Sequence, residues 1–460
     1  MGMRYDEESF SILSTHYMQL IWRISNISRS RFCIVTTLLV AFFSTAQATE
    51  QERSQTGAAM EIADTTPPDA PAGLMATVST AGIALDWNDN SETDLAGYNV
   101  YRSASSSGPW TKLNGSLLSA SAYYDSTAQP GVTSYYAVVA VDTSGNASAK
   151  ARKSGARLFT AITWSSAAAA PLKRSEAFGT TANGKLYVFG GYYGDPDYTP
   201  TRRADAYDPA TNTWTPIANL RRGLSHAGVA EDGGKIYFAG GYPARAGGIG
   251  QNFSTRAVWK YDTSTNAYAS MPPLPAARAG GVLVRVGRIM PYFGGSDRNR
   301  YDSGTHWALN IDTGTAWTTL SPMPTPRNHL GGAVLNGKIY AVGGQSGQDA
   351  AALYRRDVDA YDPTTNSWIA VASLPQVRSH HNASTFAMGG RIIAVGGESA
   401  YTAGSLANVT AYDPTTNSWT ELTPLPARRS AAVADQINGV LYVATGSMSA
   451  STFKGVPLAQ

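Results

Sequence analysis

Five pairs of adjacent glycines recur through the second half of this chain at nearly regular intervals. The intervals are 50, 54, 49 and 53 residues, and the pairs are Gly190-Gly191, Gly240-Gly241, Gly294-Gly295, Gly343-Gly344 and Gly396-Gly397. A degenerate sixth copy, Thr445-Gly446, follows 49 residues after Gly396. A fixed local pattern with a period near 50 residues indicates an array of small antiparallel sheets, one for each repeat.

Each glycine pair ends a short apolar run, such as KLYVFGG, KIYFAGG or KIYAVGG. These runs are too short for helices and are rich in β-branched and aromatic residues, so they predict strands. A second strand downstream ends in Tyr-Asp or Ile-Asp and leads into a turn such as DPATNTW. The turn ends at an aromatic residue that opens a third strand: Trp214, Tyr268, Trp317, Trp368 and Trp419. We expect these aromatic residues to pack within the sheets and not to contact a ligand.

Glycine pair, Tyr-Asp, Trp and then Pro-Arg, in this order, resemble the kelch signature. The resemblance implies an all-β fold in which residues 156–460 form a kelch β-propeller. Six glycine-pair strands predict six blades. The last repeat lacks an outer strand, whereas Trp164, in AITWSS, stands before the first glycine pair. We therefore predict that residues 161–165 supply the missing strand and close the ring, which leaves no open sheet edge.

Residues 66–155 have a different pattern. ALDWNDN, YNVYR and SYYAVVAVD alternate apolar and polar residues between Gly, Pro, Ser and Asn clusters, as in a seven-stranded sandwich. This segment resembles a fibronectin type III domain, and residues 49–65 are expected to be a linker into it.

The amino terminus has the features of a signal peptide. An apolar run over residues 33–43 follows Arg23, Arg29 and Arg31, and Ala46-Gln47-Ala48 fits a signal-peptidase site. We therefore predict a signal peptide over residues 1–48, with Met18 as an alternative start, and a secreted, periplasmic or cell-surface protein. The apolar run is too short for a stable membrane span.

Composition excludes several classes of function. The net charge is only +3 and no basic stripe is present, so nucleic acid is not an expected partner. The one cysteine, Cys33, lies in the predicted signal peptide, which excludes disulfides and a cysteine-dependent copper site from the mature chain. The histidines show no HxH or HxxxH spacing, so we predict neither a metal site nor a cofactor.

The resemblance implies that the strand before each glycine-pair strand is innermost, with its start at the mouth of the central channel. To find these starts, we count back nine residues from the residue that opens each glycine-pair strand. The count gives Glu176, His226, Ala279, His329 and Ala431. In the fifth copy the count gives Asn382, with His380 and His381 just before it. Around His329, PRNHLGGAVLNGKIYAVGG resembles a stretch of human propellers that bind acidic peptides, which implies that His329 reaches the ligand.

We predict that ligand-binding residues form a polar, mostly cationic ring at this mouth. The set is Arg174, Arg222, His226, Arg278, Arg327, His329, Arg378, His380, His381 and Arg429, with Arg428 as an alternative to Arg429. Arginine forks suit carboxylates. The alternative is that each arginine only fixes a loop between blades. Residues after the glycine pairs form a second candidate set: Tyr192, Tyr193, Tyr242, Gln345, Glu398 and Tyr401.

Two functions fit these residues. We favour an exported, non-catalytic binding or scaffold protein whose channel mouth binds a glycan or a protein partner, because no nucleophile–base pair, carboxylate pair or phosphate loop is present. The alternative is a sugar epimerase or mutarotase acting on an acidic sugar such as sialic acid, since exported six-bladed kelch proteins include sialic acid epimerases. In that alternative Glu176, His226 and His329 would supply acid and base, and Arg278 or Arg327 would hold the carboxylate.

Overall fold

A computed structural model describes residues 63–194, 197–401 and 404–459. The predicted signal peptide, and all but the last three residues of the predicted linker, therefore lie outside the described residues. The fold is all-β: the helical elements in the described part are two 3-10 turns, η1 (Asp349–Ala351) and η2 (Asn382–Ser384). No helix in this part is long and apolar enough to cross a membrane.

Residues 75–156 form two antiparallel sheets that share one core. The three-stranded sheet contains β1 (Met75–Val78), β2 (Ile83–Asp86) and β5 (Ala122–Asp125). The four-stranded sheet contains β4 (Thr111–Lys112), β3 (Leu95–Ser103), β6 (Thr133–Asp142) and β7 (Ala151–Ala156). Alternate residues of β2, β3 and β6, including Leu85, Val100 and Val138, are buried between the two sheets with Trp87. The segment is therefore a β-sandwich of seven strands.

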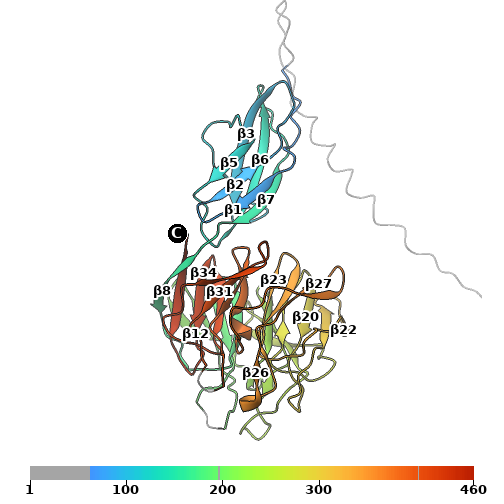
Figure 1. The fold of residues 1–460 in the computed structure, drawn as a ribbon, viewed down its shortest axis with the longest axis vertical. Helices are drawn as coiled ribbons and strands as arrows, with labels where there is room; N and C mark the ends of the chain where they lie inside the picture. The colour runs from blue at the N-terminus through green and yellow to red at the C-terminus, as the bar shows by residue number, and fades with distance from the viewer. Residues whose placement is uncertain (1–62, 195–196, 402–403, 460) are drawn as a thin grey trace, which may run out of the picture. The chain divides into compact units, whose positions relative to one another are not determined.

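Six four-stranded antiparallel sheets make up the rest of the described chain, and we number them sheets 1 to 6 (Figure 1). Sheet 1 contains β9 (Phe178–Ala182), β10 (Lys185–Phe189), β11 (Ala204–Asp208) and β12 (Thr213–Pro216). Sheet 2 contains β14 (Gly228–Asp232), β15 (Lys235–Ala239), β17 (Val258–Asp262) and β18 (Ala267–Met271). Sheet 3 contains β19 (Val282–Leu283), β20 (Ile289–Phe293), β21 (His306–Asn310) and β22 (Thr318–Thr319).

Sheet 4 contains β23 (Gly331–Leu335), β24 (Lys338–Val342), β27 (Val358–Asp362) and β28 (Ser367–Ala370). Sheet 5 contains β29 (Thr385–Met388), β30 (Arg391–Val395), β31 (Val409–Asp413) and β32 (Ser418–Leu422). Sheet 6 contains β33 (Val433–Ile437), β34 (Val440–Ala444), β35 (Thr452–Leu458) and β8 (Ala161–Ala167). Two short hairpins accompany these sheets: β13 (Leu224–Ser225) with β16 (Tyr242–Pro243), and β25 (Gln345–Ser346) with β26 (Leu353–Tyr354).

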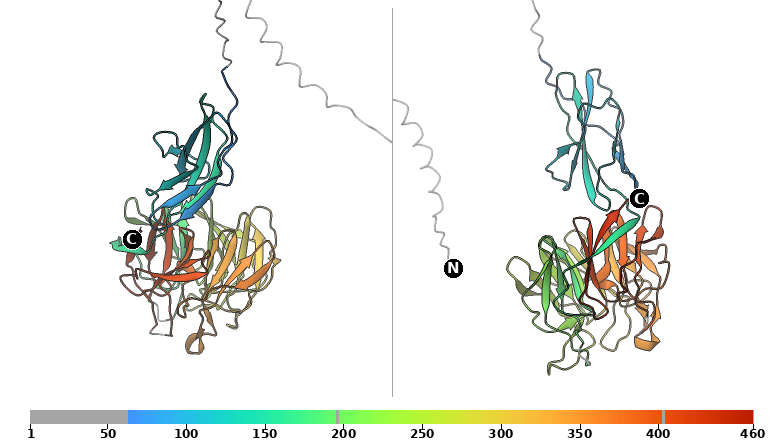
Figure 2. Two further views of the ribbon diagram at one scale, coloured as in Figure 1. Left: turned by 45° about the horizontal axis from the view of Figure 1, so that its top comes forward. Right: turned by 90° about the vertical axis from the view of Figure 1, so that its left-hand side faces the viewer.

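The first strands of the six sheets form a closed ring. Each of β9, β14, β19, β23, β29 and β33 contacts the first strand of the next sheet, and β33 contacts β9. Figure 2 shows the sheets around this ring, coloured from green to red. The ring brings the starts of six strands, distant in sequence, to one axis.

The two ends of the ring meet in sheet 6, where β8 pairs antiparallel with β35 from Ala161↔Leu458 to Ala167↔Thr452. In Figure 1 the green β8 lies among the red strands of the carboxyl end. Trp164 Nε1 donates a hydrogen bond of 3.1 Å to the Thr423 carbonyl, which ties β8 to sheet 5. Trp214, Trp317, Trp368 and Trp419 donate to carbonyls of the preceding repeat in the same way. The tryptophans therefore join neighbouring sheets.

Candidate binding site

In each repeat, a residue that lies shortly before the first strand of the sheet adopts the same unusual backbone conformation. The φ angles of these six residues lie between 50° and 65°, in the left-handed region. The residues are Glu176, His226, Gly280, His329, His380 and Ala431. Their backbones form a chain of hydrogen bonds around the axis. Each amide N–H donates to the preceding member's carbonyl, with N···O distances of 3.4, 2.9, 2.8, 3.0 and 2.8 Å from His226 to Ala431. This chain, here called the axial ring, identifies the equivalent position in every repeat.

The axial ring corrects two of the positions predicted by counting. In the third repeat the member is Gly280 and not Ala279, because β20 begins at Ile289, one residue after the Arg288 from which the count was made. In the fifth repeat the member is His380 and not Asn382. The 3-10 turn Asn382–Ser384 lies between His380 and β29 and lengthens that connection.

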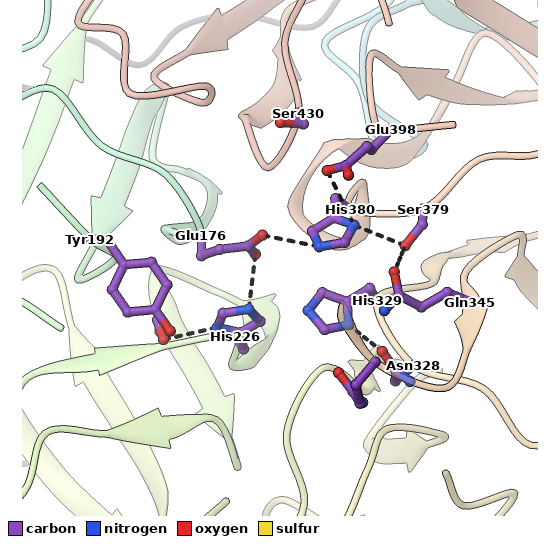
Figure 3. A network of polar contacts seen from close by, with 12 residues as sticks. Glu176, Tyr192, His226, Asn328, His329, Gln345, Ser379, His380, Glu398 and Ser430 are labelled. Carbon is purple, nitrogen blue, oxygen red and sulfur yellow. Dashed lines mark hydrogen bonds and ion pairs between the residues drawn. The ribbon is translucent and has the colours of Figure 1, made fainter. Parts of the chain in front are cut away.

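Four side chains of the axial ring converge on one point (Figure 3). The carboxyl of Glu176 lies between two imidazoles, with Oε2 3.4 Å from His226 Nε2 and Oε1 3.6 Å from His380 Nε2. The ring of His329 lies edge-on to His226, with centroids 4.8 Å apart, and 4.3 Å from the centroid of His380. Gly280 has no side chain, which allows His226 and His329 to meet across it.

Burial shifts the protonation of this cluster. Burial, with the nearby carboxylate of Glu398, raises the pKa of Glu176 to about 8. Burial lowers the pKa of His380 to about 4 and holds those of His226 and His329 well below their usual value. The three imidazoles are therefore neutral at pH 7, because the charged form is disfavoured away from water.

Neighbouring side chains fix the orientation of each imidazole. His226 Nδ1 contacts Ser225 Oγ at 2.9 Å, and His380 Nδ1 contacts Ser379 Oγ at 3.0 Å. His329 Nδ1 contacts Asn328 Oδ1. In all three repeats the residue before the histidine holds Nδ1, so that Nε2 is left for the centre of the cluster.

The cluster lies in a pocket of about 600 Å3. Aromatic, amide and charged side chains surround it, mainly from the loops after the glycine pairs: Tyr192, Tyr198, Tyr242, Gln251, Phe253, Arg300, Gln345, Gln348, Asp349, Tyr354 and Tyr401. Arg300 donates to both carboxylate oxygens of Asp349, at 2.6 and 2.9 Å, and stacks 4.8 Å from the centroid of Phe253. Tyr242 packs against His226 with centroids 4.3 Å apart.

The predicted cationic ring of arginines is wrong. Arg174, Arg327 and Arg378 are completely buried, and their guanidinium groups donate to backbone carbonyls near the strand ends. Arg174 and Arg327 also pair with Asp205 and Asp359. Strand ends next to a glycine pair leave carbonyl groups without ladder partners, and a buried guanidinium satisfies several of them at once. These arginines hold the sheets together.

The remaining arginines and His381 also lie away from the pocket lining. Arg222 donates to the Ala244 carbonyl. Arg278 stacks on Trp307 and Arg429 on Phe453, both with the guanidinium carbon 5.1 Å from the ring centroid. His381 is completely buried, and its Nδ1 contacts Thr385 Oγ1 at 2.7 Å. Of the predicted ligand-binding residues, only His226, His329 and His380 line the pocket, together with Glu176 from the catalytic alternative.

Several pocket residues were not predicted from the sequence. Arg300, Phe253 and Gln251, and Tyr354 of the short strand β26, lie in connections whose length differs from repeat to repeat, so no shared position marks them. The second candidate set was more informative, because Tyr192, Tyr242, Gln345 and Tyr401 line the pocket. Glu398 lies beside it, 3.7 Å from His380 Nδ1, whereas Tyr193 is 46% exposed and outside the lining.

Comparison with known proteins agrees with the repeat pattern. The KLHDC2/KLHL20/DRC7 Kelch-repeats domain family matches residues 225–446, and the Kelch motif family matches residues 173–221. The chain is a kelch-repeat protein. Kelch-like protein terF of Aspergillus terreus is 28% identical over 274 residues, which cover 56% of this chain and 58% of that protein.

Other kelch proteins show similar levels of identity. Kelch repeat-containing protein At3g27220 of Arabidopsis thaliana is 26% identical over 62% of this chain and 71% of that protein. Human Kelch-like protein 23 is 26% identical over 58% of this chain and 45% of that protein. A solved structure titled "Structure of YjhT" aligns with a TM-score of 0.47 and 17% identity, covering 64% of this chain and 95% of that one.

Proposed function

We propose that this chain is an exported, non-catalytic binding protein that takes a neutral, hydroxyl-rich ligand, such as a carbohydrate, in the pocket above the axial ring. In this proposal the six sheets act as a six-bladed kelch propeller, the sandwich is a fibronectin type III spacer, and residues 1–48 direct export. The observation that carries the proposal is the composition of the pocket, in which aromatic faces and uncharged polar groups surround one paired arginine.

The size and lining of the pocket support a small ligand more than a protein surface. A volume of about 600 Å3 falls in the range of small-molecule sites. Tyr242, Phe253 and Tyr354 offer apolar faces for a sugar ring, while Gln345 and Gln348 carry groups that both donate and accept hydrogen bonds.

Charge argues for a neutral ligand and against an acidic one. Among the described residues, Arg300 is the one arginine in the lining, and it already donates two hydrogen bonds to Asp349. Glu398 adds a carboxyl group beside the pocket, whereas Glu176, with a pKa of about 8, is largely uncharged at pH 7. A carboxylate ligand would have to displace Asp349 from Arg300, whereas a hydroxyl ligand would not.

Geometry also favours binding over the epimerase alternative. Epimerisation needs an acid and a base on opposite faces of a sugar ring. The ligand atoms of Glu176, His226 and His329 all lie within 4.8 Å of one another, so the three groups address one face. Arg278 and Arg327, which would hold a sugar carboxylate, are not in the lining. We therefore expect anomer exchange at the rate of buffer alone in proton NMR.

The test is direct binding by untagged protein of residues 49–460. A glycan array would identify a ligand, and calorimetry would then measure its affinity for wild type and two variants. Phe253→Ala changes a residue in the pocket. Tyr301→Ala is the control, because Tyr301 is 73% exposed and lies outside the lining. We expect Phe253→Ala to weaken binding about tenfold, a loss of about 1.4 kcal/mol, and Tyr301→Ala to leave it unchanged. Unchanged binding by Phe253→Ala, or no glycan bound by wild type, would reject the proposal.

A further inference from the structure

The cluster at the floor of the pocket contains four side chains that can each donate an electron pair: one carboxyl and three imidazoles. Nε2 of His226 and Nε2 of His380 point at the two oxygens of the Glu176 carboxyl, and His329 packs against both imidazoles (Figure 3). The Glu176 carboxyl contacts these two imidazoles, and no other described residue donates a hydrogen bond to it.

The hydrogen bonds of Asn328 fix the tautomer of His329. Its side-chain amide nitrogen donates to Asp302 and to the Gly347 carbonyl. Oδ1 must therefore be the atom that faces His329, and an amide oxygen only accepts. The proton of His329 consequently lies on Nδ1, and Nε2 carries a free lone pair.

The tautomer of His380 follows from a similar chain. The side-chain nitrogen of Gln345 donates to the Gly347 carbonyl, so that its Oε1 faces Ser379. Ser379 donates its single hydroxyl proton to that oxygen at 2.8 Å. Ser379 Oγ can then only accept from His380 Nδ1, at 3.0 Å. Nε2 of His380 therefore presents a lone pair to Glu176, as metal-binding histidines do when their other nitrogen is held.

The spacing of these atoms suits a transition metal. Bond lengths of ~2.0–2.1 Å place the ligand atoms of a tetrahedral zinc ion ~3.4 Å apart. The observed separations are 3.4 Å from His226 to Glu176 and 3.6 Å from His380 to Glu176. The ligand atoms of Glu176, His226 and His329 all lie within 4.8 Å of one another, so small rotations close the set around an ion.

We propose that Glu176, His226, His329 and His380 bind one divalent transition-metal ion of the zinc class at the floor of the pocket. Three imidazole nitrogens and one carboxylate oxygen are ligands that this class accepts. The cluster is backed by the axial ring, which fixes four backbones, and by Asn328 and Ser379, which orient two imidazoles. The HxH and HxxxH spacings are absent because every ligand comes from a different repeat.

The test uses untagged protein stripped with chelator and then titrated with Zn2+ or with Co2+ as a visible-absorption probe. Wild type should bind about one ion, and Co2+ should give the intense absorption of a low-coordinate nitrogen and oxygen site. His329→Gln and His226→Gln should lose this binding. His381→Gln, the matched control at a neighbouring histidine outside the cluster, should retain it. Asn328→Leu should weaken it by about 10- to 100-fold, because the orienting partner is lost.

Thermal unfolding in chelator shows whether each variant is folded, so loss of binding is not confused with loss of structure. Wild type that binds no ion would overturn the proposal. Binding that survives in His329→Gln would do so too, since the ion would then lie elsewhere, such as at the acidic cluster Asp64, Asp94 and Asp142. Sugar binding that persists without any metal binding would reject this inference alone and leave the proposed function standing.

Discussion

The backbone amide of His329 donates a 2.8 Å hydrogen bond to the carbonyl of Gly280, and this contact joins sheets 3 and 4 at the axis. It is one of five such bonds in the axial ring. All six members adopt a positive φ, which directs their amides and carbonyls along the ring. The same conformation points Glu176 and three histidines into one cluster.

The left-handed backbone of the axial ring can be tested at Ala431. Its φ is 51°, a conformation that costs a residue with a Cβ ~1–2 kcal/mol and glycine little. Ala431→Gly should therefore leave the free energy of unfolding unchanged or raise it by up to ~1 kcal/mol. Ala432→Gly, at a buried neighbour outside the positive-φ set, should lower it by about 1 kcal/mol. Urea unfolding would compare them, and equal losses in both would contradict this geometry.

Arg327 should be essential for the stability of the fold, and it should not contact the ligand. Its guanidinium is fully buried, pairs with Asp359 at 2.8 Å and donates to the Gly343 carbonyl at 2.7 Å. Arg327→Met would leave Asp359 buried without its partner, and we expect the free energy of unfolding to fall by about 3–5 kcal/mol. Arg222→Met, at an exposed arginine, should change stability by no more than ~0.5 kcal/mol. An Arg327 variant with wild-type melting and weak ligand binding would restore the arginine-ring hypothesis.

Closure of the ring through β8 predicts different outcomes for two truncations. A chain that starts at Ala167 loses most of β8 and exposes the edge of β35, so it should aggregate or melt at a markedly lower temperature. A chain that starts at Ser154 keeps β8 and Phe159, whose carbonyl accepts from Arg391 at 2.7 Å, and should stay folded. Scanning calorimetry would distinguish them. Identical melting would mean that β8 is not needed to close the ring.

His306 predicts part of the acid sensitivity of the protein. Burial lowers its pKa to about 4, although its Nδ1 donates to the Ser321 carbonyl at 3.1 Å. Between pH 6.5 and 4 the unfolded chain binds a proton that the folded chain does not, so stability is present above this window and is lost as the pH falls. The loss attributable to His306 should reach up to ~3 kcal/mol. His306→Asn should show a smaller stability difference between pH 7 and pH 4.5 in chelator, and an unchanged difference would refute the assignment.

Much of the fold could be predicted because its signals repeat. Glycine pairs and Tyr-Asp turns mark the second and third strands of sheets 1, 2, 4 and 5, and the isolated Trp164 pointed to β8. The arginines could not be assigned from the pattern alone. A repeated arginine suits either a ligand or the backbone carbonyls of its own sheet, and only burial decides between them.

The candidate site was predictable only in part, for the same physical reason. Glu176, His226 and His329 lie on the repeat and were found by counting, but the inserted turn Asn382–Ser384 displaced the count at His380. Arg300 and Phe253 come from loops that share no length or sequence, so their convergence depends on the closed ring. The absence of HxH spacing was uninformative, because the ring assembles its histidines from separate repeats.

The location of the ligand tests the central claim most directly, and a crystal structure of the protein with its array-selected glycan would measure it. We predict that the glycan lies in the pocket above the axial ring, stacked on Phe253 or Tyr242 and within hydrogen-bonding distance of Gln345 or Arg300. Density for the glycan at the surface around Arg222, or at the opposite end of the central channel around Glu231 and Arg285, with this pocket holding only water, would contradict the account.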